Sequence, residues 1–222
     1  TIVGLAIRPA QDGTARTVPS GAVARQVVAL DGDALVLVDS NPGAHLQNHG
    51  CLPLAHRPLA GATVLAKGPD AAAAYHLALD EWRTLTASTL VGITRTALDL
   101  GVDYARERRQ FGRPIGSFQA VQHHCANMAT DVEGSRVVAY QAAWKVSEGV
   151  PAQREVSVAK AWVSAAYQRV CSTAHQTHGA IGFTKEHDLQ LYTRRAKIQE
   201  LNYGDVNFHK DVALQYMERE LA

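Results

Sequence analysis

The residues best suited to chemistry lie in the last third of the chain, where residues 175–184 read HQTHGAIGFT. Two glycines in this segment, Gly179 and Gly182, have two interpretations. A glycine here often marks the end of a helix and the turn that follows it. Residues without a large side chain also let backbone amides approach a phosphate or a ribose closely. The segment is therefore a candidate binding site for a ligand that carries these groups.

A second segment, residues 106–116, reads RERRQFGRPIG. Its arginines lie where a long helix is expected to end, and cations at that end interact favourably with the helix dipole. That interpretation accounts for the charge alone. It does not explain why Gln110-Phe111-Gly112 is followed so closely by Pro114-Ile115-Gly116.

Together the two segments resemble the paired flavin-binding signatures of the acyl-CoA dehydrogenase family. The similarity covers roughly residues 1–220, which correspond to the family's middle β domain and C-terminal helical domain. It implies that Arg108 contacts the pyrophosphate of FAD, for which a guanidinium fork is suited, and that Phe111 lies beside the adenine. The later segment would contact FAD bound mainly by a neighbouring subunit. The resemblance implies the following cofactor ligands: Arg108, Gln110, Phe111, Gln119, Gln176, Gly179 and Ala180.

The catalytic base of the family has no clear counterpart. Members of the family remove the α-proton of a CoA thioester with a glutamate, which many of them place just before a glycine in a segment that resembles residues 196–205. Tyr203 stands at that position here, and a tyrosine with a pKa near its usual value of about 10 is a poor base at neutral pH. Other members carry the glutamate on the helix that here starts near Pro69. Glu81 lies about one residue out of phase with it, a rotation of roughly 100°. Asp205 is the remaining candidate, and we expect it to cap a helix or lie near the FAD ribose.

The resemblance also implies a leading helical domain, and the given sequence starts directly in a β region. That domain forms one wall of the acyl and flavin pocket in the family. We expect either that the chain is a fragment or that a homologous subunit supplies the wall.

The elements that must position these residues fall into two regions, which together predict an α+β chain. Residues 1–68 have strand character and are expected to form a partial, barrel-like middle β domain. A hairpin is predicted for residues 26–30 and 34–38 around Asp31-Gly32-Asp33, and a further strand for residues 63–66. This region is too short to close well alone, so its faces should be covered.

Residues 69–222 have helical periodicity and are expected to form a four-helix bundle that binds FAD and oligomerises. The first helix should run from Pro69 to about Gln110, with Gly112 and Pro114 beyond its end. The second should cover about residues 117–148 and the third should begin at Pro151, with Val156, Val163 and Val170 on its inner face. The fourth should cover about residues 187–217, with a break expected near Gly204. The three tryptophans fall on helical stripes and are expected in the core or at an interface.

The bulk composition excludes several classes of function. The 222 residues carry a net charge of +1, which gives no general case for a nucleic acid or an anionic membrane as partner. The three cysteines are widely spaced, which indicates reduced thiols and a cytoplasmic location. No apolar run reaches the length of a membrane span. The pairs His123-His124 and His175/His178 lack acidic or cysteine partners at metal-ligand spacing, so no metal site is predicted.

From the resemblance we expect an FAD-dependent acyl-CoA dehydrogenase that desaturates a CoA thioester, with this chain as the subunit that lacks the catalytic glutamate in a heteromeric complex. The closest resemblance is to actinobacterial paired dehydrogenases that act on steroid side chains. Its partners would be the acyl-CoA, the homologous subunit or a second copy, and an electron-transfer acceptor. The alternatives are a non-catalytic structural subunit, an enzyme of this fold with hydration or elimination chemistry in which Tyr203 is the acid, and a homodimer in which Glu81 is the base.

Overall fold

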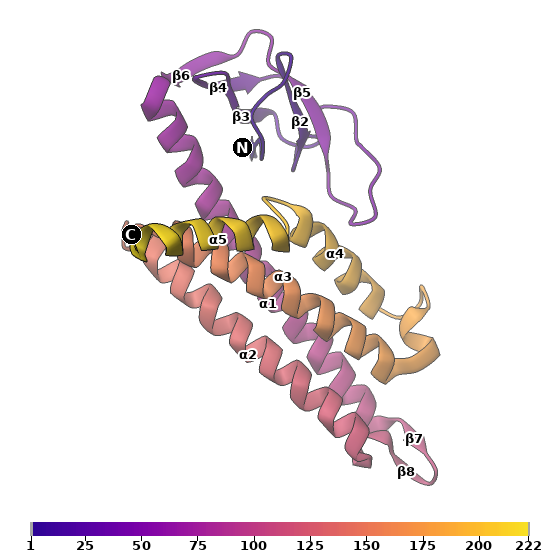
Figure 1. Ribbon diagram of the computed structural model, residues 1–222. Coiled ribbons are helices and arrows are strands. Elements are labelled where there is room, and N and C mark those ends of the chain that lie inside the picture. The colour runs from indigo at the N-terminus through magenta and orange to yellow at the C-terminus, as the bar shows by residue number, and fades with distance from the viewer. Residues whose placement is uncertain (1, 222) are drawn as a thin grey trace. The chain divides into compact units, whose positions relative to one another are not determined.

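The computed structural model describes residues 2–221 and divides into two compact units, Thr1–Leu79 and Asp80–Ala222. The first unit contains the β-strands β1 to β6, and the second contains most of the helices (Figure 1). Helix α1 (Gly68–Glu107) begins next to the expected boundary at residue 68, and the two units divide inside this helix. The chain is therefore α+β, as the sequence predicted.

The first unit is built on a four-stranded sheet with the strand order β1-β3-β4-β6, and β2 pairs with β5 separately. Its strands are β1 (Val3–Leu5), β2 (Thr14–Val18), β3 (Gln26–Asp31), β4 (Ala34–Asp39), β5 (Ala55–Pro58) and β6 (Thr63–Lys67). The predicted hairpin is confirmed, because β3 and β4 are antiparallel and pair Asp31 with Ala34 across the turn. Strand β6 is confirmed as well, whereas β1, β2 and β5 were missed because such short strands carry little alternation.

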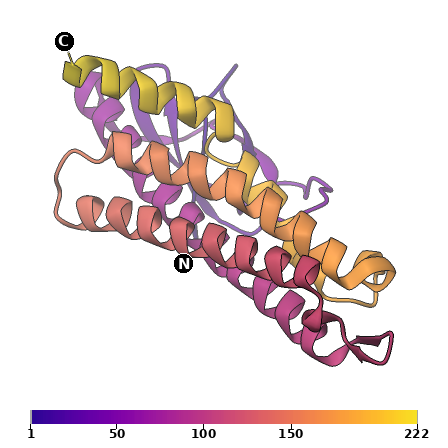
Figure 2. The same ribbon diagram turned by 60° about the horizontal axis from the view of Figure 1, so that its bottom comes forward.

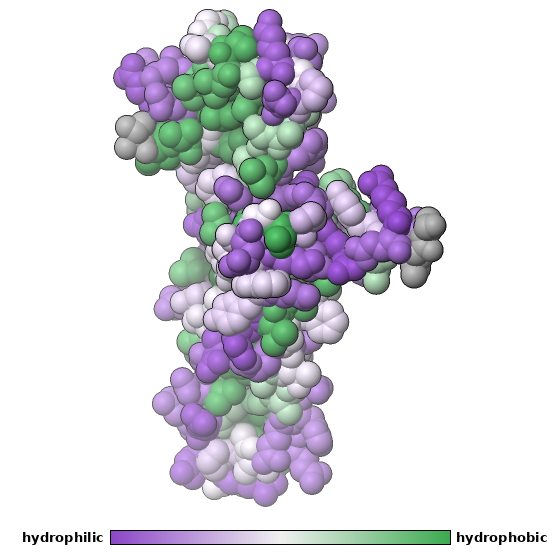
Figure 3. Space-filling view, turned by 90° about the vertical axis from the view of Figure 1, so that its left-hand side faces the viewer, coloured by the Kyte–Doolittle hydropathy of each residue, from purple (hydrophilic) through white to green (hydrophobic). Residues whose placement is uncertain are grey.

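Small aliphatic side chains fill the interior of this unit, among them Val18, Val27 and Val38. Arg57 is fully buried with them, and its guanidinium donates to the carbonyl oxygens of Arg25 at 3.0 Å and Ser40 at 3.1 Å. The first turns of α1 supply part of the cover that the strands need, because the Tyr75 hydroxyl donates to the Ala6 carbonyl at 2.9 Å. On the face shown in Figure 3, apolar side chains still gather over this unit.

The helical unit is arranged around α3. It consists of the second part of α1, the hairpin β7 (Arg109–Gln110) and β8 (Arg113–Pro114), η1 (Ile115–Ser117), α2 (Gln119–Ser147), α3 (Gln153–His178), η2 (Gly179–Phe183), α4 (Leu189–Leu201) and α5 (Val206–Leu221). Helix α3 packs against α2, α4 and α5 (Figure 2). The predicted inner face is confirmed, since Val156, Val163 and Val170 are all buried.

The tryptophans do not lie in the core. Trp82, Trp144 and Trp162 are 41%, 59% and 46% exposed, so the core alternative was wrong and the interface alternative stays a prediction. The Trp162 ring, for example, lies over the surface of α2. A Cβ atom added to Gly134 would come within 3.2 Å of that ring.

Two helix ends are set by backbone with positive φ, and one of them differs from the expected end. Helix α1 ends at Glu107, before the expected Gln110, because Phe111 (φ 54°) and Gly112 (φ 79°) form the two-residue turn of the hairpin β7–β8. The expected break of the last helix is confirmed. Tyr203 (φ 63°) and Gly204 (φ 108°) separate α4 from α5, so the chain has five helices within residues 2–221 and not four. None of these helices combines the length and apolar character needed to cross a bilayer.

Candidate functional site

The hairpin β7–β8 carries the first signature segment at one end of the helical unit. Backbone pairing joins Arg109 to Pro114 and Gln110 to Arg113. The Arg113 guanidinium lies 4.0 Å from the centroid of the Phe118 ring. The Phe111 ring meets Phe118 only edge-on at 6.1 Å and is 92% exposed. The hairpin therefore presents an uncovered aromatic ring on a short, regular support.

Close packing holds the base of this hairpin against α1. A Cβ atom on Gly116 would lie 2.9 Å from the carbonyl oxygen of Ala105, so only glycine fits there. The side chains of Arg108, Gln110 and Gln119 project from this base and are exposed. Neither Arg108 nor Arg109 forms an ion pair with any residue in the described range 2–221. The guanidinium groups are thus available to an anion.

The second signature segment forms the C-terminal end of α3 and the short helix η2. Gly179 caps α3 with φ 65°, and no atom lies within 4 Å of the position that its Cβ would occupy. Gln176 and Ala180 beside it are exposed. Gly182 has the opposite surroundings, because a Cβ there would lie 2.8 Å from the Cβ of His178. Gly179 therefore leaves open space for a ligand, while Gly182 serves the packing of the turn.

Aromatic and histidine rings connect the two segments. The rings of Tyr104 on α1 and His178 on α3 stack with their centroids 4.6 Å apart, and His178 meets His187 at 4.6 Å. His175 stacks on Phe183 at 4.7 Å. Burial lowers the pKa of both His175 and His178, which favours neutral rings at physiological pH. These histidines pack and orient the segments, and no cluster of three potential metal ligands occurs in residues 2–221.

The seven candidate ligands therefore gather at one end of the helical unit, and all of them are exposed. Arg108, Gln110, Phe111 and Gln119 lie around the hairpin, and Gln176, Gly179 and Ala180 lie at the end of α3. This set fits a ligand with an aromatic ring and a phosphate group. An uncovered ring can stack on a base, unpaired guanidinium groups can bind phosphate, and an open glycine admits a close backbone approach.

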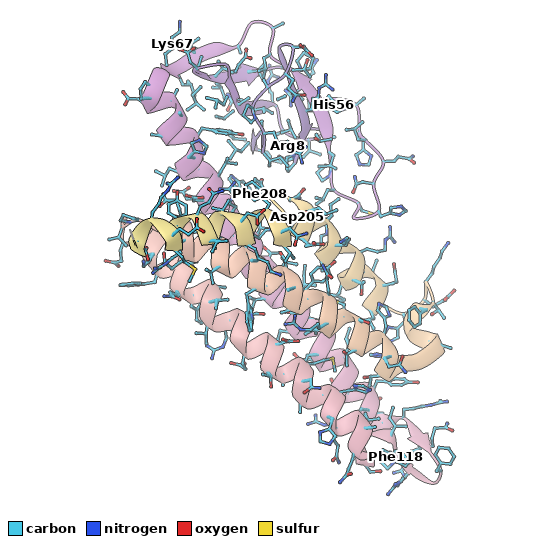
Figure 4. All side chains as sticks on the ribbon, viewed as in Figure 1. Arg8, His56, Lys67, Phe118, Asp205 and Phe208 are labelled. Carbon is cyan, nitrogen blue, oxygen red and sulfur yellow. The ribbon has the colours of Figure 1, made fainter. Side chains whose placement is uncertain are left out.

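The turn between α4 and α5 lies away from this end. Phe118 marks the hairpin end in Figure 4, whereas Asp205 and Phe208 mark the start of α5. Tyr203 in the turn is only 6% exposed, and its ring stacks on Trp82 with the centroids 6.0 Å apart and the planes 7° from parallel. The Tyr203 ring is therefore covered by Trp82 and not open to solvent.

The two carboxylates considered as substitutes for the base lie in different surroundings. The Asp205 Oδ1 atom accepts the Phe208 backbone N–H at 2.9 Å, so Asp205 is an N-cap of α5, one of the two roles that we expected. Glu81 is exposed on α1. Its neighbour Asp80 is buried and pairs with Arg83 at 2.9 Å.

A buried polar cluster beneath the turn was missed by the sequence reasoning. Lys160 on α3 is fully buried, and its ammonium donates to the carbonyl oxygens of Glu200 at 2.8 Å and Gly204 at 2.9 Å. Burial lowers the Lys160 pKa to about 7. His209 on α5 donates from Nε2 to the Tyr203 carbonyl at 2.9 Å, and burial lowers its pKa to about 3. The one available signal was a lysine on the inner, Val- and Ala-rich face of α3.

Comparison with known proteins identifies the family to which the chain belongs. The family profile described as "Acyl-CoA dehydrogenase, C-terminal domain" matches residues 72–217. The chain belongs to the acyl-CoA dehydrogenase family.

Three similar proteins give the extent of the likeness. The probable acyl-CoA dehydrogenase YngJ of Bacillus subtilis is 40% identical over 57% of this chain and 33% of its own length. The acyl-CoA dehydrogenase IpdE2 of Mycolicibacterium smegmatis is 35% identical over 80% of this chain and 53% of its own length. A solved variant of the Tcur3481-Tcur3483 steroid ACAD superposes with a TM-score of 0.82 at 27% identity, over 99% of this chain and 63% of that one. The chain thus spans between a third and about half of the length of these two curated relatives.

Proposed function

We propose that this chain is one subunit of a heteromeric, FAD-dependent acyl-CoA dehydrogenase, in which it helps to hold FAD while a homologous subunit provides the catalytic glutamate. The observation that carries this proposal is the contrast within the helical unit. The end with the flavin signatures is exposed and unpaired, whereas position 203 holds a buried tyrosine stacked on Trp82.

FAD, when bound, supplies the acceptor for the hydride that leaves the β-carbon of the thioester. The protein groups of this chain bind and orient it. Arg108 pairs with the pyrophosphate and Phe111 stacks against the adenine. The backbone at Gly179 and Ala180, with the Gln176 amide, contacts the cofactor from the end of α3. Because all these groups face outward, they complete a site that is formed mainly by another subunit.

Proton abstraction needs a group that is both basic near neutral pH and within reach of the α-proton. The Tyr203 phenol is a poor candidate for this role, since its ring is buried and stacked on Trp82. The Asp205 carboxylate is engaged as the cap of α5. Glu81 remains the candidate within this chain, and the Glu81→Gln variant distinguishes it from a base on the partner.

The substrate is a CoA thioester, and a bulky, steroid-type acyl group is the subclass we favour. This inference rests on the likeness to IpdE2 and to the steroid ACAD structure. A separate electron-transfer protein would be the electron acceptor. The contact with the homologous subunit involves the exposed apolar side chains on the outer surface of α2 and α3, which are Val137, Tyr140, Trp144, Val158 and Trp162.

The proposal is tested by purifying the chain alone and together with its homologous subunit, and by recording the mass and the flavin spectrum of each sample. We expect flavin to be retained only in the complex, and bleached there by a CoA thioester. A flavin-free chain that forms no complex, or a complex inert toward every acyl-CoA, contradicts it. If the isolated chain turns over and Glu81→Gln abolishes this activity, the homodimer alternative is correct.

A further inference from the structure

The turn that carries Tyr203 is held in an unfavourable backbone conformation. Tyr203 has φ 63°, a region that costs a bulky residue on the order of 1–3 kcal/mol and persists only where the surroundings enforce it. Gly204 follows with φ 108°, and a Cβ there would lie 2.4 Å from Cδ1 of Phe208 and 2.7 Å from Nε2 of His209. The helical unit must therefore supply contacts that hold both residues in place.

Those contacts come from three different helices. The Tyr203 carbonyl accepts from Nε of Arg83 on α1 at 3.1 Å and from Nε2 of His209 on α5 at 2.9 Å. The Gly204 carbonyl accepts from Nζ of Lys160 on α3 at 2.9 Å. Lys160 also binds the Glu200 carbonyl at 2.8 Å, so it ties the last turn of α4 to the turn that follows. Both consecutive carbonyls of the strained turn are thus fixed from outside their own segment.

The donors are themselves fixed. Nδ1 of His209 lies 3.3 Å from the Ser157 hydroxyl, which leaves Nε2 as the protonated nitrogen of a neutral ring. Arg83 pairs with Asp80 at 2.9 Å, and its guanidinium lies 5.6 Å from the centroid of the Phe208 ring. These groups lie on helices rather than loops, which is the arrangement that positions a site most accurately.

A fully buried lysine is a costly way to stabilise a helix, because removing an ammonium from water is unfavourable and apolar residues of similar volume pack as well. Proteins bury a charged side chain in an apolar interior mainly where function requires it. The charged side chains near Lys160 are Glu200, Arg83 and Asp205, and Lys197 neutralises the Glu200 carboxylate at 2.6 Å. The Lys160 ammonium therefore acts chiefly on the two carbonyl oxygens and not as the partner of a carboxylate.

We propose that Lys160, together with Arg83 and His209, is a positioning site that fixes the backbone at residues 203 and 204, so that the side chain at position 203 projects in one direction whatever its chemistry. In this chain these three side chains hold the backbone so that the Tyr203 ring stacks on Trp82. The importance of position 203 for the reaction rests on the proposed function, because it is the position at which the family resemblance places the base. The positioning itself does not depend on flavin.

The test uses Trp82 as the only tryptophan, in the full chain with Trp144→Phe and Trp162→Phe. We expect Lys160→Met to release the turn and to shift the Trp82 emission, as Tyr203→Ala does by removing the stacked ring. When Lys160→Met and Tyr203→Ala are combined, the shift of the Trp82 emission should be no larger than in Tyr203→Ala alone. Lys197→Met is the matched control, because Lys197 also contacts Glu200 but through its carboxylate, and it should leave the emission unchanged.

Two outcomes overturn the proposal. One is an unchanged Trp82 emission in a folded Lys160→Met variant, and the other is a pair of shifts from Lys160→Met and Tyr203→Ala that simply add. If Lys160→Met does not fold, Arg83→Gln, which removes a donor to the Tyr203 carbonyl at a partly exposed site, must give a smaller shift in the same direction. No shift there also contradicts the proposal.

A second measurement, of kcat, tests whether the positioning by Lys160 matters for catalysis. It also distinguishes failure of the positioning role from failure of the proposed function. The complex used here carries glutamine in place of the partner's catalytic glutamate, so that the partner's base does not set the rate. In this flavin-loaded complex, Tyr203→Glu offers a carboxylate at position 203. Adding Lys160→Met to it should lower kcat on the order of 100-fold at unchanged flavin content, since small misplacements cost that much. An equal kcat with and without Lys160 contradicts the positioning role. A complex without flavin contradicts only the proposed function, because the Trp82 measurement needs none.

Discussion

The two ends of the helical unit differ in how many of their polar groups are bonded within the chain. At the hairpin and the end of α3, the candidate ligands are exposed and the guanidinium of Arg108 forms no ion pair in residues 2–221. At the turn between α4 and α5, both strained carbonyls are bound by donors from three helices, of which Lys160 and His209 are buried. In the proposed function the exposed end would bind a large ligand together with another subunit, whereas the turn between α4 and α5 is already fixed by donors of this chain.

The largest effect is expected from filling the closed turn. Gly204→Ala introduces a Cβ within 2.4 Å of the Phe208 ring at φ 108°, so the turn or the Phe208 side chain must move. We expect the free energy of unfolding to fall by about 3 kcal/mol, measured by urea denaturation. Gly149→Ala is the control, because Gly149 also has positive φ but has open space around it, and about 1 kcal/mol is expected. Equal losses would show that the turn is not tightly packed.

The closed turn should also make stability depend on acid pH. The His209 pKa falls to about 3 in the folded chain, mainly through burial and then through Lys160 and Arg83, against about 6.5 when unfolded. The folded state therefore binds fewer protons than the unfolded state between these values. The contribution of His209 is fully present above pH 6.5 and is lost as the pH falls toward 3, by a few kcal/mol. Urea midpoints between pH 7 and 4 measure it, with His209→Gln as the variant in which this slope should flatten.

At the open end, substitution should change binding and leave stability alone. Arg108→Ala should weaken FAD binding in the complex by ~10–100-fold, since a charge-assisted hydrogen bond contributes about 1.5–3 kcal/mol. Phe111→Ala should weaken it less. Both should leave the unfolding free energy within about 0.5 kcal/mol of the wild type, because these side chains are exposed.

Arg106→Ala is the matched control for this end, because Arg106 pairs with Asp103 at 3.5 Å on the last turns of α1 and is no candidate ligand. Flavin affinity measured by fluorescence titration should be unchanged in it. If Arg106→Ala and Arg108→Ala weaken FAD binding equally, the effect is general electrostatics and the assignment of Arg108 fails.

The smallest effect concerns Asp205 and separates a cap from a base. Asp205→Ala should lower the unfolding free energy by about 1 kcal/mol, and Asp205→Asn much less, because asparagine also caps helices. Neither should alter the rate of flavin reduction in the complex by more than about twofold. A rate lost in Asp205→Asn, which keeps the cap but removes the base, would identify Asp205 as catalytic.

The sequence predicted those parts of the molecule that depend on local pattern. The apolar face of α3, the hairpin around Gly32 and the break at Gly204 all follow from period or turn chemistry. The hairpin β7–β8 was not predicted, because its turn requires a positive φ at Phe111, a residue type that rarely adopts it. The exposed tryptophans were ambiguous, since a helical stripe does not show which side a neighbouring helix covers.

The candidate site was predictable in part for a similar reason. Motifs bring out residues that are near each other in sequence, such as Gln110 and Phe111. The positioning site combines Arg83, Lys160 and His209 from three helices, and these residues are too far apart in sequence to form a motif. Only the packing of α1, α3 and α5 around the turn reveals it.

In the proposed complex the base comes from the partner and not from position 203 or Glu81. The most direct test is the rate at which an acyl-CoA bleaches the flavin of the assembled complex. Tyr203→Phe and Glu81→Gln in this chain should each retain the rate within about twofold, while replacing the partner's catalytic glutamate with glutamine should lower it by ~10²–10⁴-fold. Loss of bleaching in Tyr203→Phe or Glu81→Gln, with the flavin still bound, would show that the base belongs to this chain.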